Sequence, residues 1–113
     1  MKEGGIVFAP AGAATRTVPE PGMLRQVLAY NQDVMLVRHH LSKGWQGASH
    51  SHPHEQLVYV VTGCILFTAG GRTIEMRSGD SVVVDGDVEH HASATEDSEV
   101  LDVFVPYRKE YAQ

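Results

Sequence analysis

Cysteine is almost absent from this sequence: among its 113 residues, Cys64 is the only one. A single cysteine excludes an internal disulfide, so nothing in the chain requires an oxidising compartment, and a reducing cytoplasm is the expected location. Cys64 stands in the apolar run CILF, which predicts a buried and unreactive thiol.

Clustered positive charge is also absent. The chain has 14 acidic and 9 basic residues and a formal net charge of -5, so it lacks the electrostatic footprint of a protein that binds nucleic acid or an anionic membrane. No segment reaches the roughly 18 apolar residues that a membrane-spanning helix needs. The apolar run at residues 6–9 stops at Pro10 and is too weak for a signal peptide. We therefore expect a soluble, unprocessed protein with no nucleic-acid partner and no membrane partner.

Helical periodicity is missing too, and short β-rich runs separated by turn residues take its place. Gly70-Gly71 predicts a tight hairpin, and the sequence RSGD predicts a break after the next run. Strands at intervals of about ten residues, without crossover helices, predict an all-β fold, either an antiparallel sandwich or a barrel. The predicted runs are residues 24–30, 34–41, 56–63, 64–70, 72–79, 81–86 and 99–106.

The length of the chain allows one domain with a single modest core. Residues 1–22 are rich in Gly, Ala, Pro and Thr without a sustained period, which predicts an irregular or edge-pairing N-terminal arm. Residues 23–113 are predicted to form a single β-barrel domain.

The stretch HSHPHEQ, residues 50–56, carries the strongest chemical signal. On an extended strand His50 and His52 would share one face with Cα atoms about 6.6 Å apart, so that both imidazoles can reach one metal ion. A chain with seven histidines can also produce such a pair by chance, as solvated loop side chains that bind nothing. The pair alone leaves both interpretations open.

The glycines and the later histidine around this stretch give it a resemblance to the two motifs of the cupin superfamily. The resembling segments are GWQGASHSHPHEQLVYVVTG and GDSVVVDGDVEHH, residues 44–63 and 79–91. The second motif departs from the family at Asp85, usually Pro, and at Asp87, usually Gly, so the turn before His90 is expected to differ in shape. The resemblance implies a jelly-roll barrel, which is an antiparallel double-stranded β-helix.

Carried over position by position, the resemblance implies one divalent transition metal ion with four ligands: His50, His52, Gln56 and His90. Gln56 stands where many cupins have Glu. Because an amide oxygen is neutral, the ion would keep its full charge and would favour an anionic ligand. Three imidazoles and an amide oxygen suit Zn, Ni, Mn, Fe or Cu alike.

His54 has the same parity as these ligands, but Pro53 is expected to bend the chain beside it. A role for His54 as a ligand, or as a neighbour of one, is the lesser alternative. Surface or hydrogen-bonded positions are predicted for the other histidines, His39, His40 and His91.

The segment EVLDVFVPYRKEY, residues 99–111, has two unlike faces. Leu101, Val103 and Val105 make one face purely apolar, whereas Asp102 shares the other with Phe104. A carboxylate in so apolar a strand is either exposed on an outer face or buried for a purpose. The pattern alone leaves both possibilities open.

Within the cupins, the chain resembles a small single-domain type, the pectin degradation proteins that linearise unsaturated uronates. The resemblance lies in the strand at residues 25–30, in the HxHxHxQ pattern and in LDVFVPYR at residues 101–108. It implies that Asp102 moves a proton, that Arg108 pairs with the substrate carboxylate and that Phe104 shapes the pocket. Arg25 is predicted to be either an anion contact or a structural or rim residue.

The implied function is metal-dependent, non-redox conversion of a 4,5-unsaturated uronate to its linear keto form, with a small anionic sugar acid as partner. One alternative is a cupin dioxygenase, although the ligand set lacks a carboxylate. Another is a non-catalytic module that binds a sugar acid or a metal. A homodimer is expected, because a small β-rich chain gains stability when a second copy covers an apolar sheet face or pairs with its arm.

Overall fold

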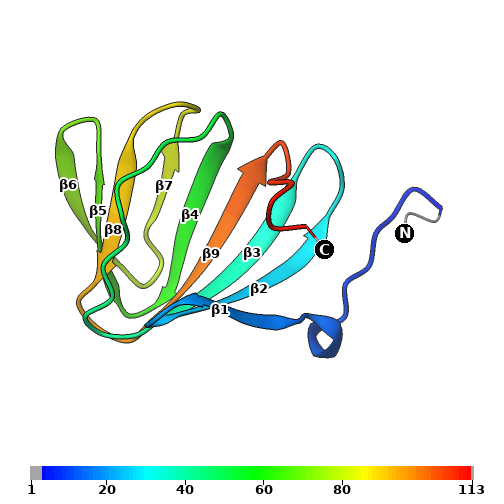
Figure 1. The fold of residues 1–113 in the computed structure, drawn as a ribbon, viewed down its shortest axis with the longest axis horizontal. Helices are drawn as coiled ribbons and strands as arrows, with labels where there is room; N and C mark the ends of the chain where they lie inside the picture. The colour runs from blue at the N-terminus through cyan, green and yellow to red at the C-terminus, as the bar shows by residue number, and fades with distance from the viewer. Residues whose placement is uncertain (1–3, 113) are drawn as a thin grey trace.

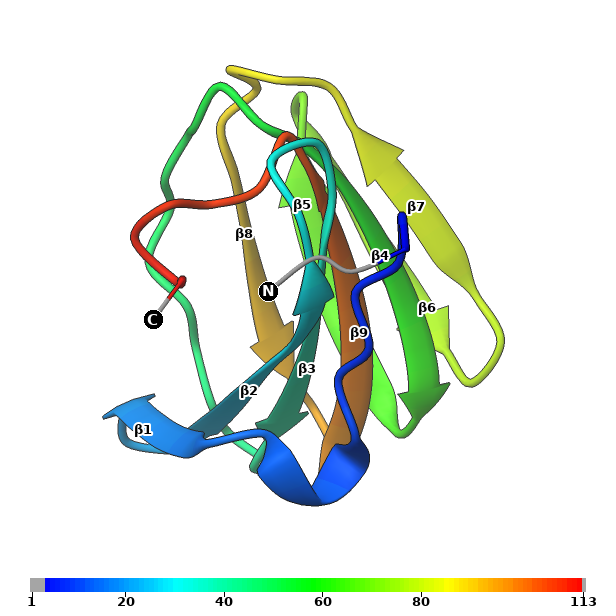
Figure 2. The same ribbon diagram turned by 90° about the vertical axis from the view of Figure 1, so that its right-hand side faces the viewer.

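The computed structural model describes residues 4–112, and its regular structure is almost entirely antiparallel β-sheet. Two sheets face each other, a larger one with strand order β1-β2-β3-β9-β4-β7 and a smaller one with order β6-β5-β8 (Figures 1 and 2). No helix within residues 4–112 combines the length and the apolar character that a membrane crossing needs. The strands are β1 (Arg16–Glu20), β2 (Met23–Tyr30), β3 (Met35–Leu41), β4 (Glu55–Thr62), β5 (Cys64–Ala69), β6 (Arg72–Arg77), β7 (Ser81–Val84), β8 (His90–Ala94) and β9 (Ser98–Val105).

The predicted antiparallel sandwich or barrel is confirmed. Seven of the strands coincide with predicted runs, and Gly70 and Gly71 form the predicted hairpin with φ angles of 58° and 76°. β8 was missed, because its sequence HHASA has no apolar alternation that would distinguish it from a loop. β1 falls inside the predicted arm and pairs with β2 at the edge of the larger sheet.

The core lies between the two sheets and follows the alternation of each strand. In β4, Val58 and Val60 are buried, whereas Leu57 and Tyr59 on the opposite face are each 43% exposed. The main cluster consists of Leu41, Val58, Val60, Ile65, Phe67, Met76, Val84, Ala94 and Val100. Cys64 is buried as expected.

A second, smaller cluster closes the other end of the larger sheet. Met35, Val37 and Phe104 are buried there under the segment that follows β9. That C-terminal segment folds back beside the sheet (Figure 1), and its Tyr107 ring stacks on Tyr30 with centroids 5.9 Å apart. The chain end therefore forms part of the wall of the barrel.

The outer face of the larger sheet carries exposed apolar side chains on β4, β7 and β9. They include Leu57, Tyr59, Val83 and Val105. Such a face suits contact with a second molecule. The homodimer stays a prediction.

Gly63, which joins β4 to β5, is expected to tolerate no side chain. Its φ angle is 92°, and a Cβ there would lie 2.4 Å from the carbonyl oxygen of Asp97 and 2.7 Å from the Cα of Ser98. Gly63→Ala should therefore lower the free energy of unfolding by roughly 2–5 kcal/mol, through a strained backbone and overpacking. Urea unfolding measures this loss. Gly12→Ala is the control, because a Cβ at Gly12 meets no atom within 4 Å; equal stability of the two variants would contradict the prediction.

Candidate metal centre

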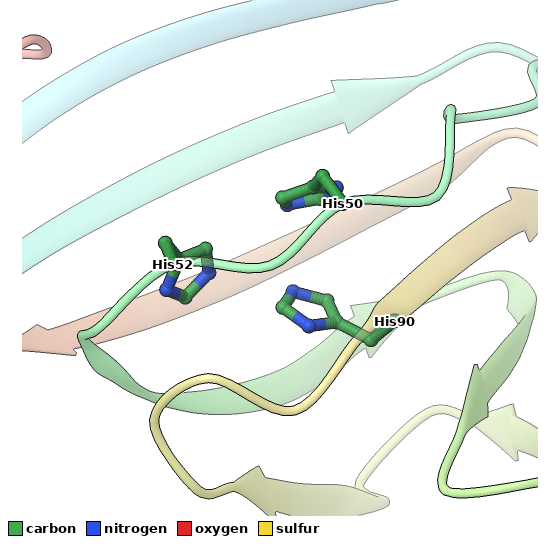
Figure 3. Close-up of side chains that lie close together, drawn as sticks. All are labelled: His50, His52 and His90. Atoms are coloured by element: carbon green, nitrogen blue, oxygen red, sulfur yellow. The ribbon is translucent and has the colours of Figure 1, made fainter.

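Three imidazoles converge between the sheets (Figure 3). His50 and His52 come from the irregular segment before β4, and His90 is the first residue of β8. One ligand nitrogen from each ring lies within 4.8 Å of those of the other two. The chain around His50 and His52 is not a regular strand as the spacing argument supposed; instead His50 forms an isolated antiparallel bridge with His90, with backbone hydrogen bonds of 3.0 and 2.9 Å.

The backbone fixes which nitrogen of each ring is free. Nδ1 of His50, His52 and His90 lies 3.0, 3.1 and 2.8 Å from the carbonyl oxygens of Ala48, His54 and Val88, respectively. A carbonyl oxygen can only accept, so each Nδ1 carries the proton and each Nε2 keeps its lone pair. All three rings are thus held in the tautomer that suits metal binding through Nε2.

Gln56, near the start of β4, completes the set. Its Nε2 donates to Oδ1 of Asp102 at 2.8 Å, which turns its Oε1 toward the histidines, 3.1 Å from Nε2 of His52 and of His90. Because the Nδ1 atoms carry the ring protons, Oε1 of Gln56 and the Nε2 atoms of His52 and His90 are all acceptors, and no hydrogen lies between them. A cation would satisfy them together, so the donor set of three imidazoles and one amide oxygen fits a divalent transition metal ion.

The turn that delivers His90 keeps a glycine-like backbone despite its unusual sequence. Asp87, where cupins usually have Gly, has a φ angle of 69°, which Asp tolerates better than most residues. Its N–H donates to the carbonyl oxygen of His52 at 2.8 Å. A Cβ on the neighbouring Gly86 would lie 2.3 Å from the carbonyl oxygen of Pro53, so the turn packs directly against the first histidine segment.

His54 lies outside the three-histidine group. The chain bends at Pro53 and His54, and the His54 ring meets the His52 ring edge-on with centroids 5.3 Å apart. His54 therefore supports the position of His52 through ring contact and backbone, since its carbonyl oxygen accepts the Nδ1 proton of His52.

Asp102, on β9, is buried and not on the outer face. Only 5% of its surface is exposed, and it lies beside the histidine cluster on the inner face of the larger sheet. Its Oδ1 accepts from Gln56, and its Oδ2 lies 2.7 Å from Nδ1 of His39. The structure thus decides between the two possibilities that the strand pattern left open.

Phe104 and Arg108 border the same space. A cavity of about 460 Å³ is lined by His50, Gln56, His90, Asp102, Phe104 and Arg108, among others. The Phe104 ring meets His52 edge-on, and Arg108 stacks 4.2 Å above the Tyr111 ring while it pairs with Glu110 at 2.7 Å. The two predicted residues are therefore near the histidines, but Arg108 already has a carboxylate partner.

Two residues of this neighbourhood escaped sequence reasoning. His39 is buried and hydrogen-bonded on both ring nitrogens, to Asp102 and to Arg25. Tyr111 accepts from Arg25 at 3.2 Å, and its ring lies between the guanidinium groups of Arg25 and Arg108. Neither residue had a sequence signal, because the pairing of His39 with Arg25 depends on the register of β3 against β2, and the contacts of Tyr111 depend on the return of the C-terminal segment.

Acid is expected to destabilise the metal-free protein because of the buried histidines. Burial is the main cause that lowers the pKa of His52 and of His90 from 6.5, and the charge of Arg108 also lowers both. Below pH 6.5 the unfolded chain binds protons that the folded chain does not, so the free energy of unfolding should fall from about pH 6.5 downward until the folded pKa values are passed.

Thermal unfolding in a chelator, followed by circular dichroism between neutral pH and about pH 5, measures this fall. His90→Gln should flatten the pH dependence, whereas His40→Gln, at an exposed position, should leave it unchanged. If stability depended on pH as steeply in His90→Gln as in the parent, His90 would not be a cause of the acid destabilisation.

The fold and the site together define a class of protein: a small jelly roll with three imidazoles arranged between its sheets as a metal-binding site would require. The family model of the cupin domain matches residues 37–105, so the chain belongs to the cupin family.

One relative of the chain is named for pectin degradation, and two solved structures are similar to the chain over more than nine-tenths of its length. The pectin degradation protein KdgF of Dickeya dadantii (strain 3937) is 29% identical over 92 residues, 80% of this chain and 84% of the relative. The structure of KdgF from Halomonas sp. superposes with a TM-score of 0.88 at 31% identity, over 94% of this chain and 98% of that one. An RmlC-like cupin from Shewanella frigidimarina NCIMB 400 also has a TM-score of 0.88, at 30% identity over 93% and 95% of the two chains.

Proposed function

We propose that this protein converts a 4,5-unsaturated uronate, a product of pectin- or alginate-type breakdown, into its linear keto form. The observation that carries the proposal is the buried carboxylate of Asp102, held beside the three-histidine site in a cavity that also contains the cation of Arg108. Similarity to KdgF supports the substrate class.

The reaction is an isomerisation and needs proton movement without a redox change. The anomeric hydroxyl loses its proton, the bond from the anomeric carbon to the ring oxygen breaks, and an aldehyde and an enolate result. The enolate then gains that proton on carbon, which gives the ketone. No atom is added or lost overall.

Asp102 is placed to move these protons. Each of its oxygens accepts one hydrogen bond within the protein, from Gln56 and from His39, and a carboxylate oxygen can accept a further one from a substrate hydroxyl. The carboxylate would take the hydroxyl proton and return it to carbon as general base and acid.

Arg108 and Phe104 would position the substrate. The guanidinium of Arg108 carries donors enough to bind a substrate carboxylate in place of, or together with, Glu110. Phe104 is fully buried and gives the cavity an apolar wall that excludes water. His50, His52, Gln56 and His90 would hold the divalent ion. When bound, such an ion supplies electrophilic stabilisation of the negative charge that develops on oxygen.

The test is an NMR assay of metal-loaded protein with unsaturated galacturonate. The proton signals of the enol-ether double bond should disappear, equally fast in air and without oxygen. Turnover that stops without oxygen would identify a dioxygenase and overturn the proposal. Binding of a panel of uronates without any loss of the signals would overturn it in favour of a binding module.

A further inference from the structure

Four hydrogen-bonded side chains cross the inner face of the larger sheet. Arg25, His39, Asp102 and Gln56 come from β2, β3, β9 and β4, which are successive neighbours in the sheet. Arg25 Nε donates to His39 Nε2 at 3.0 Å, His39 Nδ1 lies 2.7 Å from Asp102 Oδ2, and Gln56 Nε2 donates to Asp102 Oδ1 at 2.8 Å. The path ends at the candidate metal centre.

The direction of every hydrogen bond in this path follows from its first member. The guanidinium of Arg25 can only donate, so His39 Nε2 must accept and the ring proton must be on Nδ1. That proton is donated to Asp102, whose carboxylate therefore accepts from both sides. Gln56 must then turn its amide N–H toward Asp102, and its carbonyl oxygen faces the imidazoles of His52 and His90.

The two central members of this path, His39 and Asp102, are buried. His39 and Asp102 are 7% and 5% exposed, so a lost partner would be replaced only poorly by water. Without the His39 donor, Oδ2 of Asp102 would lose its hydrogen-bond partner and the carboxylate would be free to rotate, so the orientation of the Gln56 amide would no longer be fixed.

We propose that His39 and Arg25 are positioning residues, which fix the orientation of the Gln56 amide and of the Asp102 carboxylate through this path. The inference rests on the proposed function, because it assumes that Gln56 is a metal ligand. His39 and Arg25 both line the cavity beside Asp102, but neither belongs to the three-histidine group, and their effect on the site runs through the hydrogen bonds to Asp102.

Cobalt(II) binding tests the inference without substrate, because affinity and visible absorption both report the ligand set. His39→Leu, which removes both hydrogen bonds, should bind Co²⁺ about 10–100-fold more weakly and with an altered spectrum, as expected when a group that orients a ligand is lost. His39→Asn places an amide donor near the position of Nδ1 and should recover part of the affinity. His40→Leu, on the same strand but exposed, is the matched control and should bind as the parent does.

If His39 only stabilised the fold, the Co²⁺ affinities of the two His39 variants would rank differently. A buried Asn packs no better than Leu, so His39→Asn would then bind Co²⁺ no more tightly than His39→Leu, and this result would overturn the inference. Arg25→Met, which keeps the apolar stem and loses the donor, covers the case in which His39→Leu does not fold, and it should also weaken binding. Parental affinity and spectrum in Arg25→Met and in a folded His39→Leu would overturn the inference and leave the proposed function intact. Failure of the parent itself to bind Co²⁺ would overturn both.

Discussion

Asp102→Asn is expected to lower kcat on unsaturated galacturonate by about 10²–10⁴-fold, the usual contribution of a positioned acid–base group. An asparagine fills the same volume and can still accept from Gln56 through its oxygen. It cannot carry a proton between the hydroxyl and the carbon of the substrate. The rate is measured by NMR from the loss of the double-bond signals, with the metal content determined on the same sample.

The control for Asp102→Asn is Asp33→Asn, which makes the same chemical change at an exposed position far along the chain. It should turn over at the parental rate. An Asp102→Asn variant that carries metal and works as fast as the parent would remove Asp102 from the mechanism. A variant that loses both metal and activity would show that Asp102 acts mainly by orienting Gln56.

Replacement of His50 and His90 together by alanine is expected to abolish metal binding and, with it, turnover. The double variant leaves only one imidazole and the amide oxygen of Gln56 in the cluster. Loss of a group that merely contacts a ligand already weakens binding about 10–100-fold, so the loss of two ligands should exceed that range. Elemental analysis of protein purified without a histidine tag measures the effect.

The matched control for this double variant is His40→Ala/His91→Ala, because it removes the same number of histidines outside the cluster. It should retain the parental metal content and rate. Equal metal content in the two double variants would show that the cluster binds no metal.

Much of the fold followed from local physical signals. Short apolar runs between turn residues marked seven of the strands, and Gly70-Gly71 marked a hairpin because both positions need positive φ angles. These features depend only on neighbours in sequence. β8 could not be found in the same way, because its place in the sheet depends on pairing with β5, and not on its own pattern.

The candidate site was foreseen less completely. The resemblance to the cupin motifs predicted one ligand set, and the structure places its side chains close together. The four residues are His50, His52, Gln56 and His90. His39 was assigned a surface or hydrogen-bonded position, and only the register of β3 against β2 and β9 reveals that its two partners are Arg25 and Asp102. Such contacts depend on strand order, which a single sequence does not specify.

Tyr111 lies between two guanidinium groups, 3.8 Å from that of Arg25 and 4.2 Å from that of Arg108. The last turn of the chain therefore separates two like charges beside the cavity, whereas residues 4–10 extend away from both sheets (Figure 1) and leave Ile6 and Phe8 largely exposed. This asymmetry has a practical consequence for protein production. A purification tag or reporter fused at the N-terminus keeps clear of the cavity, whereas one fused at the C-terminus would pull on the ring that holds the two arginines apart.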